Sequence, residues 1–231
     1  MMRIFTINNT PSSDFDIYLA DSNLFDSAGP DIDVIDIPGR SGFVHINNNR
    51  FKPFRARLKC YCTEDMQTNI DDFKNYLMSL KGIIALRDSQ HPNVFRKTIN
   101  TNGFKLDDSD KKRATFTLEF DCYPQSFLES GNNEATITSG DILTNPTFFD
   151  SKPLITVKGN GTLNIGDYEL TVNTSQTSLT IDCEAMNCYS NNVNCNNDVT
   201  LIDFPVLKTG ENEITFTGFT EVKIAPRWWR V

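Results

Sequence analysis

The amino-acid sequence predicts a mainly β protein that contains one α-helix. Three observations lead to this prediction: segments in which apolar and polar residues alternate, one segment with helical spacing, and short apolar runs separated by turn residues. In a strand with one buried face, apolar residues recur every two positions, whereas in a helix that packs on a core they recur about every 3.6 positions. At 231 residues the chain suits one large domain or two small ones.

Two alternating segments predict half-buried antiparallel strands in the first half of the chain. In 54–62 (FRARLKCYC) the apolar side chains share one face, and Arg55, Arg57 and Lys59 share the other. In 113–123 (RATFTLEFDCY) aromatic and aliphatic residues alternate with Thr, Glu and Asp in the same way. We interpret the basic residues of the first segment as an exposed strand face rather than as a phosphate-binding patch.

The helix is predicted within 63–82 (TEDMQTNIDDFKNYLMSLKG). Its apolar residues recur at intervals of four, three, four and three, which places them on one stripe of a helix. Thr63 is expected to cap its start, and Lys81 and Gly82 suit its end. Because nearly everything around it alternates, this helix is expected to lie across a sheet. The stripe consists of Met66, Ile70, Phe73, Leu77 and Leu80.

The periodicity lapses in 129–144 (ESGNNEATITSGDILT), and we place a domain boundary there, giving domains 1–130 and 131–231. Short strands separated by turns follow, which predicts a β-sandwich of jelly-roll type. GNGTLN (159–164) begins like a phosphate-binding GxGxxG loop, but a strand and not a helix follows it. A tight Asn-Gly hairpin is therefore expected at this position.

Composition argues against several classes of protein. The net charge of −8 disfavours a nucleic-acid binder, because such proteins usually carry a basic surplus. No apolar stretch approaches the roughly 18 residues of a transmembrane helix. The N-terminal segment also lacks the apolar core of a signal peptide. We therefore expect synthesis in a cytoplasm, where thiols stay reduced.

The residues that most often carry chemistry are sparse or poorly spaced. Cys183, Cys188 and Cys195 lack the paired short spacings of a zinc site, so we expect no metal and interpret them as core or loop cysteines. The other three cysteines fall on the apolar faces of predicted strands. Of the two histidines, His45 and His91, the second lies beside a proline in a predicted turn, and no nucleophile elbow accompanies either.

Two acidic runs could in principle serve glycoside hydrolysis or bind calcium: DIDVID (31–36) and LDDSDKK (106–112). Neither has the central Gly and terminal Glu of a calcium loop. We interpret them as a solvated strand edge and a hairpin tip. Without an enzyme signature, a non-enzymatic binding or structural role is predicted.

Six segments, occurring in family order along nearly the whole chain, resemble the distal tail protein (Dit) family of siphophages that infect Gram-positive hosts. Each segment is weak alone, but the set is specific. They are DIPGRSG (36–42), FDCYPQSFL (120–128), NPTFFDSKPLITVKGNGTLNIG (145–166), IDCEAMNCY (181–189), FPVLKTGENEI (204–214) and PRWW (226–229).

This resemblance implies a non-enzymatic virion component at the phage tail tip or baseplate, made in the cytoplasm of the bacterial host. It implies a hexameric ring of N-terminal belt domains around a DNA channel, with galectin-like C-terminal β-sandwiches projecting outward. The implied partners are the tail-tube protein, a tail-associated fibre or lysin protein and, in some phages, a receptor-binding protein. DNA is only passing cargo in the lumen, and no cofactor or membrane is involved.

Two other hypotheses remain open at this stage. The first is a carbohydrate-binding β-sandwich accessory protein, which would need an exposed aromatic platform. The second is a hydrolase that uses Asp31 or Asp33.

A ring requires two complementary surfaces on each subunit. At the C-terminus, strand parity places Trp228 in the core and Trp229 on the polar face beside Arg227, unless a bulge at Pro226 exchanges them. Trp229 could pack on the N-terminal domain or a neighbouring loop, contact another subunit, or form a ligand platform. The interface candidates are Pro38, Gly39, Arg40, Arg55, Arg57, Arg227 and Trp229.

Overall fold

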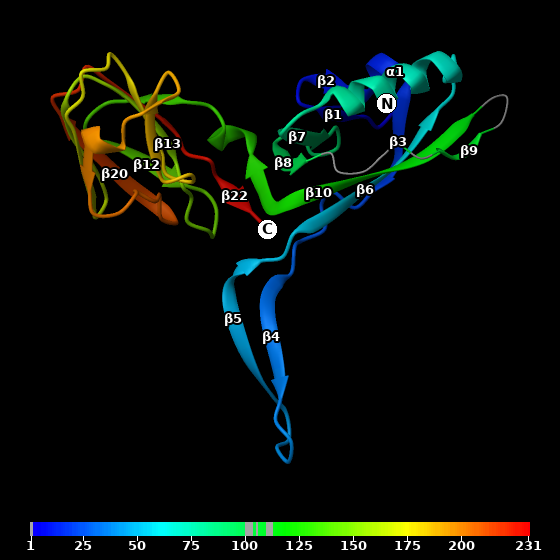
Figure 1. Ribbon diagram of the computed structural model, residues 1–231, viewed down its shortest axis with the longest axis horizontal. Coiled ribbons are helices and arrows are strands. Elements are labelled where there is room, and N and C mark those ends of the chain that lie inside the picture. The colour runs from blue at the N-terminus through cyan, green and yellow to red at the C-terminus, as the bar shows by residue number, and fades with distance from the viewer. Residues whose placement is uncertain (1, 100–103, 105, 110–112) are drawn as a thin grey trace. The chain divides into compact units, whose positions relative to one another are not determined.

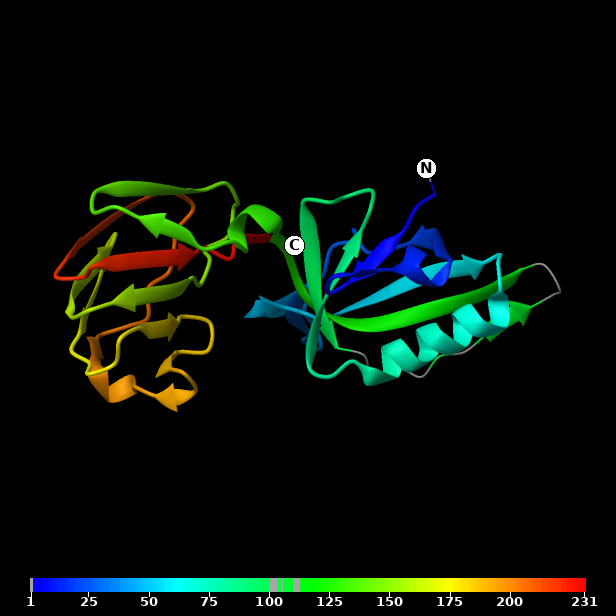
Figure 2. The same ribbon diagram turned by 90° about the horizontal axis from the view of Figure 1, so that it is seen from above.

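The computed structural model describes residues 2–99, 104, 106–109 and 113–231 (Figures 1 and 2). The chain divides into two compact units: unit 1 comprises residues 1–126 together with Val231, and unit 2 comprises residues 127–230. Strands dominate both units, and the one α-helix among the described residues is α1 (Met66–Ser79). The prediction of a mainly β chain with one helix is confirmed.

Unit 1 is built on one large sheet. Its strands follow the order β2 (Thr10–Pro11), β1 (Phe5–Ile7), β7 (Ile83–Asp88), β8 (Val94–Ile99), β10 (Ala114–Leu128), β6 (Phe54–Cys62) and β3 (Ile17–Ser22). The short β9 (Leu106–Ser109) also pairs with β10, and the 3-10 helix η1 (Ser12–Phe15) precedes β3. The predicted alternation is confirmed, because side chains of β6 and β10 switch between buried and more exposed positions along the paired region.

Helix α1 lies over the layer formed by β6 and β10 (Figure 1). Its apolar stripe faces the core, where the Phe73 ring meets Phe5 edge-on at a centroid distance of 6.1 Å. A Phe at the centre of the stripe therefore connects the helix to the sheet by apolar contact. The buried helix residues are Ile70, Phe73 and Leu77, and the partly buried ones at its ends are Met66 and Leu80.

The predicted cap at Thr63 is wrong. The helix begins at Met66, and its N-cap is Asp65, which has a left-handed conformation (φ 40°) and makes no side-chain cap hydrogen bond. The chain reverses sharply between β6 and α1, so the residue at the turn takes the unusual φ. The connection is held from outside, because the Glu64 N–H donates to Asp16 Oδ2 at 2.8 Å.

Unit 2 consists of two antiparallel sheets that share one core. The first has the order β11 (Ala135–Ile137), β21 (Glu221–Ala225), β13 (Leu154–Lys158), β16 (Leu179–Asp182), β17 (Asn187–Ser190) and β18 (Val193–Asn194). The second has the order β12 (Asp141–Asn145), β20 (Gly210–Thr217), β14 (Gly161–Ile165), β15 (Tyr168–Val172) and β19 (Val199–Leu201). Ile155 and Ile181 of the first sheet and Leu163 and Ile165 of the second lie in the same buried cluster, as in a β-sandwich.

The expected Asn-Gly hairpin at 159–161 is wrong. β13 pairs with β16 and β21, whereas β14 pairs with β15 and β20, so the chain changes sheets at this turn. The 217–221 connection changes sheets beside it, and Gly218 has φ 84°. A Cβ on Gly161 would lie 2.0 Å from the Thr217 carbonyl oxygen. Glycine is therefore required because two crossovers touch, not because a two-residue hairpin closes.

Residues 129–144, where the hydrophobic periodicity lapses, contain regular structure. They contain the 3-10 helix η2 (Glu129–Gly131), then β11, and most of β12. β11 and β12 are edge strands of the two different sheets of unit 2. Edge strands need little apolar mass, which explains why the hydrophobic pattern weakens here. A further 3-10 helix, η3 (Asn196–Asp198), lies in the Asn-rich stretch before β19.

Candidate interface surfaces

The two remaining strands of unit 1 form a long hairpin, here called the arm (residues 30–51). β4 (Pro30–Asp36) and β5 (Phe43–Phe51) pair with each other as a separate two-stranded sheet (Figure 1). The turn at its tip contains Gly39 and Gly42, both with positive φ, and closes with a hydrogen bond from the Arg40 N–H to the Ile37 carbonyl at 3.1 Å. The structure thus places Pro38, Gly39 and Arg40 together at the arm tip.

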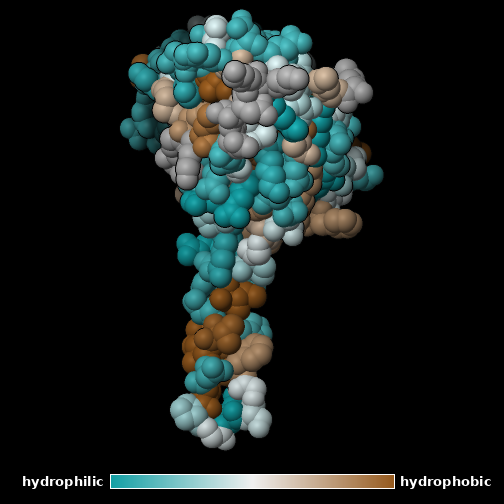
Figure 3. Space-filling model, turned by 90° about the vertical axis from the view of Figure 1, so that its right-hand side faces the viewer, coloured by the Kyte–Doolittle hydropathy of each residue, from teal (hydrophilic) through white to brown (hydrophobic). Residues whose placement is uncertain are grey.

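The arm carries apolar side chains on both of its faces. In its register Val34 lies opposite His45 and Asp36 opposite Phe43, which defines one face. The other face contains Ile35 opposite Val44 and Ile46 opposite Asp33. No arm residue is buried, and Phe43 is 62% exposed. Figure 3 shows these hydrophobic residues gathered along the arm. An isolated hairpin of this kind is marginal in water, so the arm has the character of a surface that another chain covers.

The sequence pattern contained a clue to the arm that the interpretation as a solvated strand edge missed. A strand with one wet face alternates, but here Val34 and Ile35 are consecutive apolar residues within an acidic run. Polar contacts also cross the hairpin, since Arg50 Nε donates to Asp31 Oδ2 at 2.6 Å and Asn48 Nδ2 to Asp33 Oδ2 at 3.2 Å. Both carboxylates of the hydrolase hypothesis therefore hold the arm together.

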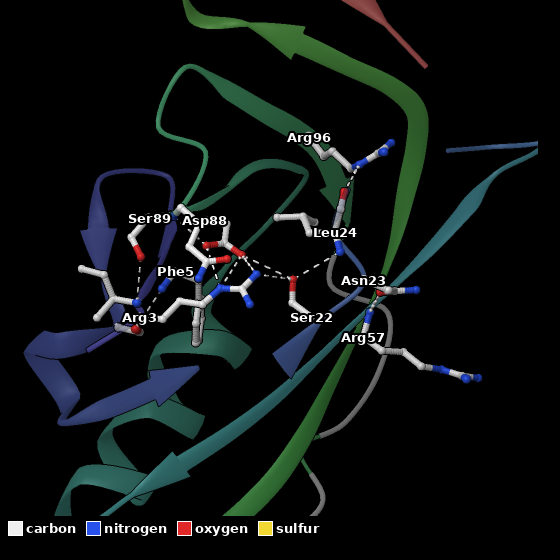
Figure 4. A network of polar contacts seen from close by, with 12 residues as sticks. Arg3, Phe5, Ser22, Asn23, Leu24, Arg57, Asp88, Ser89 and Arg96 are labelled. Atoms are coloured by element: carbon white, nitrogen blue, oxygen red, sulfur yellow. Dashed lines mark hydrogen bonds and ion pairs between the residues drawn. The ribbon is translucent and has the colours of Figure 1, made fainter. Parts of the chain in front are cut away.

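The root of the arm is held by one buried arginine on β8. Arg96 is 2% exposed, and its guanidinium donates to the carbonyl oxygens of Leu24 (2.7 Å), Asp26 (2.7 Å) and Pro124 (3.0 Å). It also lies over the Phe54 ring at 4.4 Å. Figure 4 shows Arg96 directed at the segment that leads into the arm. This buried cation thus ties residues 24–26 to β8 and β10.

A second polar cluster holds the N-terminal segment to the same sheet (Figure 4). The fully buried carboxylate of Asp88 pairs with the Arg3 guanidinium, whose Nε lies 3.1 Å from both carboxylate oxygens. Ser22 joins them, donating to Asp88 Oδ2 and bonding to the Leu24 N–H at 3.2 Å. The ion pair and its hydrogen bonds give the buried carboxylate of Asp88 a structural role, which is enough to explain its burial.

The charged face of β6 is not a free basic patch. Arg55 Nε lies 3.0 Å from Asp121 Oδ1, and Arg57 Nε lies 2.9 Å from Glu119 Oε1, across the pairing of β6 with β10. Lys59 reaches Asp21 at 3.4 Å. Alternating charges balance one another on this exposed face, which is consistent with the interpretation as a strand face and leaves little attraction for phosphate.

At the C-terminus Trp228 is buried in the unit 2 core and Trp229 is half-buried, as expected, although residues 226–228 are not in a strand and strand parity does not extend to them. A Cβ on Gly131 would lie 2.3 Å from the Trp228 nitrogen, so η2 packs directly on this tryptophan. The Leu128 N–H also donates to the Trp228 carbonyl at 2.8 Å. β22 (Trp229–Arg230) pairs with β10, whose last two residues belong to unit 2.

Arg227 and Trp229 are both engaged inside unit 2. Arg227 has φ 57° and forms a two-point ion pair with Asp182, at 2.7 and 3.1 Å. Burial raises the pKa of Asp182, but the hydrogen bonds from Arg227 and from backbone N–H groups outweigh it, so the net pKa lies below its ordinary value. Trp229 stacks on Phe149 at 4.4 Å and donates to the Asp150 carbonyl at 2.9 Å. A neighbouring loop therefore covers part of this tryptophan.

The remaining candidates for chemistry are dispersed. His45 lies exposed on the arm, and His91 is exposed in the turn between β7 and β8. Among residues 2–99, 104, 106–109 and 113–231, no three His, Cys, Asp or Glu side chains are placed to hold a metal ion. Across the same described residues, no helix is long and apolar enough to cross a membrane. Part of the acidic run 106–112 lies outside the described residues, so its interpretation as a hairpin tip stays a prediction.

The fold is that of a two-unit, mainly β protein with a long two-stranded arm. No family model and no curated protein matches the sequence. Among solved structures the chain is similar to the crystal structure of the Dit (gp 19.1) protein of phage SPP1, described as a paradigm of the hub adsorption apparatus in phages that infect Gram-positive bacteria. The TM-score is 0.72 at 14% identity, covering 97% of this chain and 98% of the SPP1 protein. The resemblance to the Dit family is thus confirmed at the level of the fold.

Proposed function

We propose that this protein is a non-enzymatic structural component of a phage tail tip, where it forms the hub of the adsorption apparatus. The observation that carries this proposal is that the similarity to SPP1 Dit covers both units and nearly all of each chain. A match of one β-sandwich alone would say little about function, because such folds serve many roles. The two proteins share the organisation of both units, and the sequence contains the family segments. Together these two observations favour a tail-tip role over the other roles of β-sandwich proteins.

The finer proposal is a hexameric ring in which the arm of one subunit docks on its neighbours. The head-to-tail contacts of a ring need two different surfaces on each subunit. An arm with Val34 and Phe43 on one face and Ile35 and Ile46 on the other supports this role, because contact on both faces would remove all four side chains from water. The other proposed parts of the interface are the arm tip, with Pro38, Gly39 and Arg40, and the charged face of β6, with Arg55 and Arg57.

The outer partners follow from the hub proposal. The ring would join the tail tube to a tail-associated fibre or lysin protein or to a receptor-binding protein, with DNA passing through its lumen. Arg227 and Trp229 already contact unit 2 internally, so any part they have in docking would add to a structural role.

Light scattering coupled to size-exclusion chromatography tests the ring. The wild-type chain is expected to elute as six subunits, and Ile46→Asp on the arm is expected to yield smaller species, since a charge cannot enter an apolar contact cheaply. Ile142→Asp is the matched control: Ile142 is a strand isoleucine in unit 2 that is 56% exposed, against 51% for Ile46. A wild-type monomer at high concentration, or an Ile46→Asp variant that assembles like wild type, would contradict the proposal.

A recess in unit 2 supports the carbohydrate-binding alternative. An open recess of about 350 Å³ lies at β15 and β19, lined by Tyr168 together with Asp167, Glu169 and Asp203. An aromatic ring next to carboxylates is a combination that can bind a sugar. Glycan-array binding by a strictly monomeric protein, lost in Tyr168→Ala, would favour that alternative over the hub.

A further inference from the structure

The hairpin of β17 and β18 ends in a two-residue turn. Ser190 pairs with Val193, and between them Asn191 and Asn192 both have positive φ, at 46° and 67°. Two consecutive positive φ values define the type I′ turn, which fixes the register of the strands that it joins. Tyr189 pairs with Asn194 in that register, so the next residues outward, one on β17 and one directly after the end of β18, also lie opposite each other.

Those two residues are Cys188 and Cys195. The Cys195 N–H donates to the Cys188 carbonyl at 2.8 Å, whereas the Cys188 N–H donates to Asn196 Oδ1 at 2.6 Å, so one backbone hydrogen bond joins this cross-strand pair. Directly opposite residues point to the same side of a hairpin, and both cysteines belong to the buried cluster of unit 2. Opposite Cα atoms of an antiparallel pair are roughly 4.5–5.5 Å apart, within the roughly 4.4–6.8 Å range of disulfides.

We propose that Cys188 and Cys195 are a modification site: they form a reversible disulfide that closes the β17–β18 hairpin. Cβ atoms of opposite residues lie about 4.5–5.5 Å apart, slightly more than the roughly 3.5–4.5 Å in a disulfide. Forming the bond therefore draws the strands together. Thiol–disulfide exchange runs in both directions, so an added thiol can open the bond again.

Cys183 is the rival partner, and the register disfavours it. Ile181 is the residue opposite Cys188, so Cys183 lies two positions beyond it along β16 and the following turn. Diagonal neighbours of this kind are about 7–8 Å apart, too far for a disulfide without movement of the backbone. The Cys183 N–H also donates to the Pro153 carbonyl at 3.1 Å, which holds this residue at the opposite edge of β16.

The oxidant is a small-molecule disulfide such as oxidised glutathione. The Cys195 thiolate attacks one glutathione sulfur, which breaks the glutathione disulfide, forms a mixed disulfide and releases one glutathione. The Cys188 thiolate then attacks the Cys195 sulfur, which forms the protein disulfide and releases the second glutathione. Two protein thiols are oxidised, one small disulfide is reduced, and both protons end on the glutathione thiols.

Both sulfurs are shielded in the folded chain. Burial raises the pKa of the Cys188 thiol to about 11, so little thiolate is present near neutral pH. The Cys195 thiol donates to the Val193 carbonyl at 3.4 Å, a contact that must break first. Oxidation therefore requires transient opening of the hairpin. The bond does not depend on the proposed function, but a virion protein would pass from reducing cytoplasm to oxidising surroundings and so meet both conditions.

Thiol mapping of the full-length protein tests the proposal. After incubation with oxidised glutathione, the number of thiols that can be alkylated in denaturant is expected to fall from six to four, since two of the six are linked. Trypsin releases residues 159–208, which hold all three cysteines of unit 2 and no internal Lys or Arg. Cleavage after Glu184 separates Cys183 from the pair, and cleavage after Tyr189 separates Cys188 from Cys195.

The expected product carries an alkylated Cys183 and a link between Cys188 and Cys195, and dithiothreitol is expected to restore all six thiols. Cys183→Ser, the matched control, is expected to lose two thiols like wild type, whereas Cys195→Ser is expected to lose none. Six alkylated thiols in oxidised wild type, or a link between Cys183 and Cys188, would overturn the proposal. Because the wild-type chain gives a decisive result by itself, the test survives even if a serine variant fails to fold.

Discussion

Replacing Arg96 by Met is expected to destabilise unit 1 and loosen the root of the arm. Met has a comparable apolar stem but donates no hydrogen bond. The carbonyl oxygens of Leu24, Asp26 and Pro124, now 2.7–3.0 Å from the guanidinium, would lose a donor, in a buried place at Leu24 and in partly buried places at the other two. Each buried acceptor left without a partner costs roughly 1–3 kcal/mol.

The opposing effect is desolvation of the charge itself. Burying a cation costs several kcal/mol, and the substitution relieves that cost. Three lost bonds amount to about 6 kcal/mol at the middle of the range, and part of this is cancelled by the relieved desolvation. We therefore expect a net loss of about 2–4 kcal/mol in the free energy of unfolding. With a urea dependence of about 2 kcal/mol per molar, the midpoint would fall by roughly 1–2 M.

Equilibrium urea unfolding followed by circular dichroism measures this shift. Tryptophan fluorescence adds a local probe, because both tryptophans belong to unit 2 and its transition should move less. Arg57→Met is the control: Arg57 is 63% exposed in its ion pair with Glu119, so its loss should cost under about 1 kcal/mol. If Arg96→Met shifts the midpoint no further than Arg57→Met, the buried guanidinium does not hold the root.

Three other substitutions probe unit 2. Gly131→Ala should destabilise it by about 2 kcal/mol or more, because the new methyl group meets the Trp228 backbone, while Gly29→Ala, with open space around it, should be nearly neutral in thermal unfolding. The ion pair with Arg227 keeps the pKa of Asp182 low, so the stabilisation from this pair is complete above about pH 4 and is lost as pH falls through the folded-state pKa. Asp182→Asn should therefore be less stable than wild type at neutral pH. The difference in Tm between the two proteins should disappear on acidification. Trp229→Ala should cost unit 2 about 1–2 kcal/mol through its lost stacking and hydrogen bond without changing the oligomeric state, and altered assembly would show that the ring also uses it.

Local periodicity was enough to predict several elements correctly. The alternation of β6 and β10 and the stripe on α1 depend only on which side of a strand or helix each residue faces, and that follows from its position in the sequence. The burial of Trp228 and the partial exposure of Trp229 were also expected, but the left-handed Arg227, and not a continuous strand, precedes them. Prediction failed where residues distant in sequence determine the local conformation. The cap at Thr63 failed because the turn between β6 and α1 is held by Asp16, which lies far away in sequence.

The amino-acid sequence by itself determined the mainly β class, the single helix and the resemblance to a tail-tip family. These depend on residue types at short spacings. Only the tertiary structure decided which strands pair, that 159–161 is a crossing between sheets, and that apolar residues of the arm such as Phe43 are exposed. Strand pairing joins residues far apart in sequence, and a residue's exposure depends on every element around it. Neither can be derived from a pattern a few residues long.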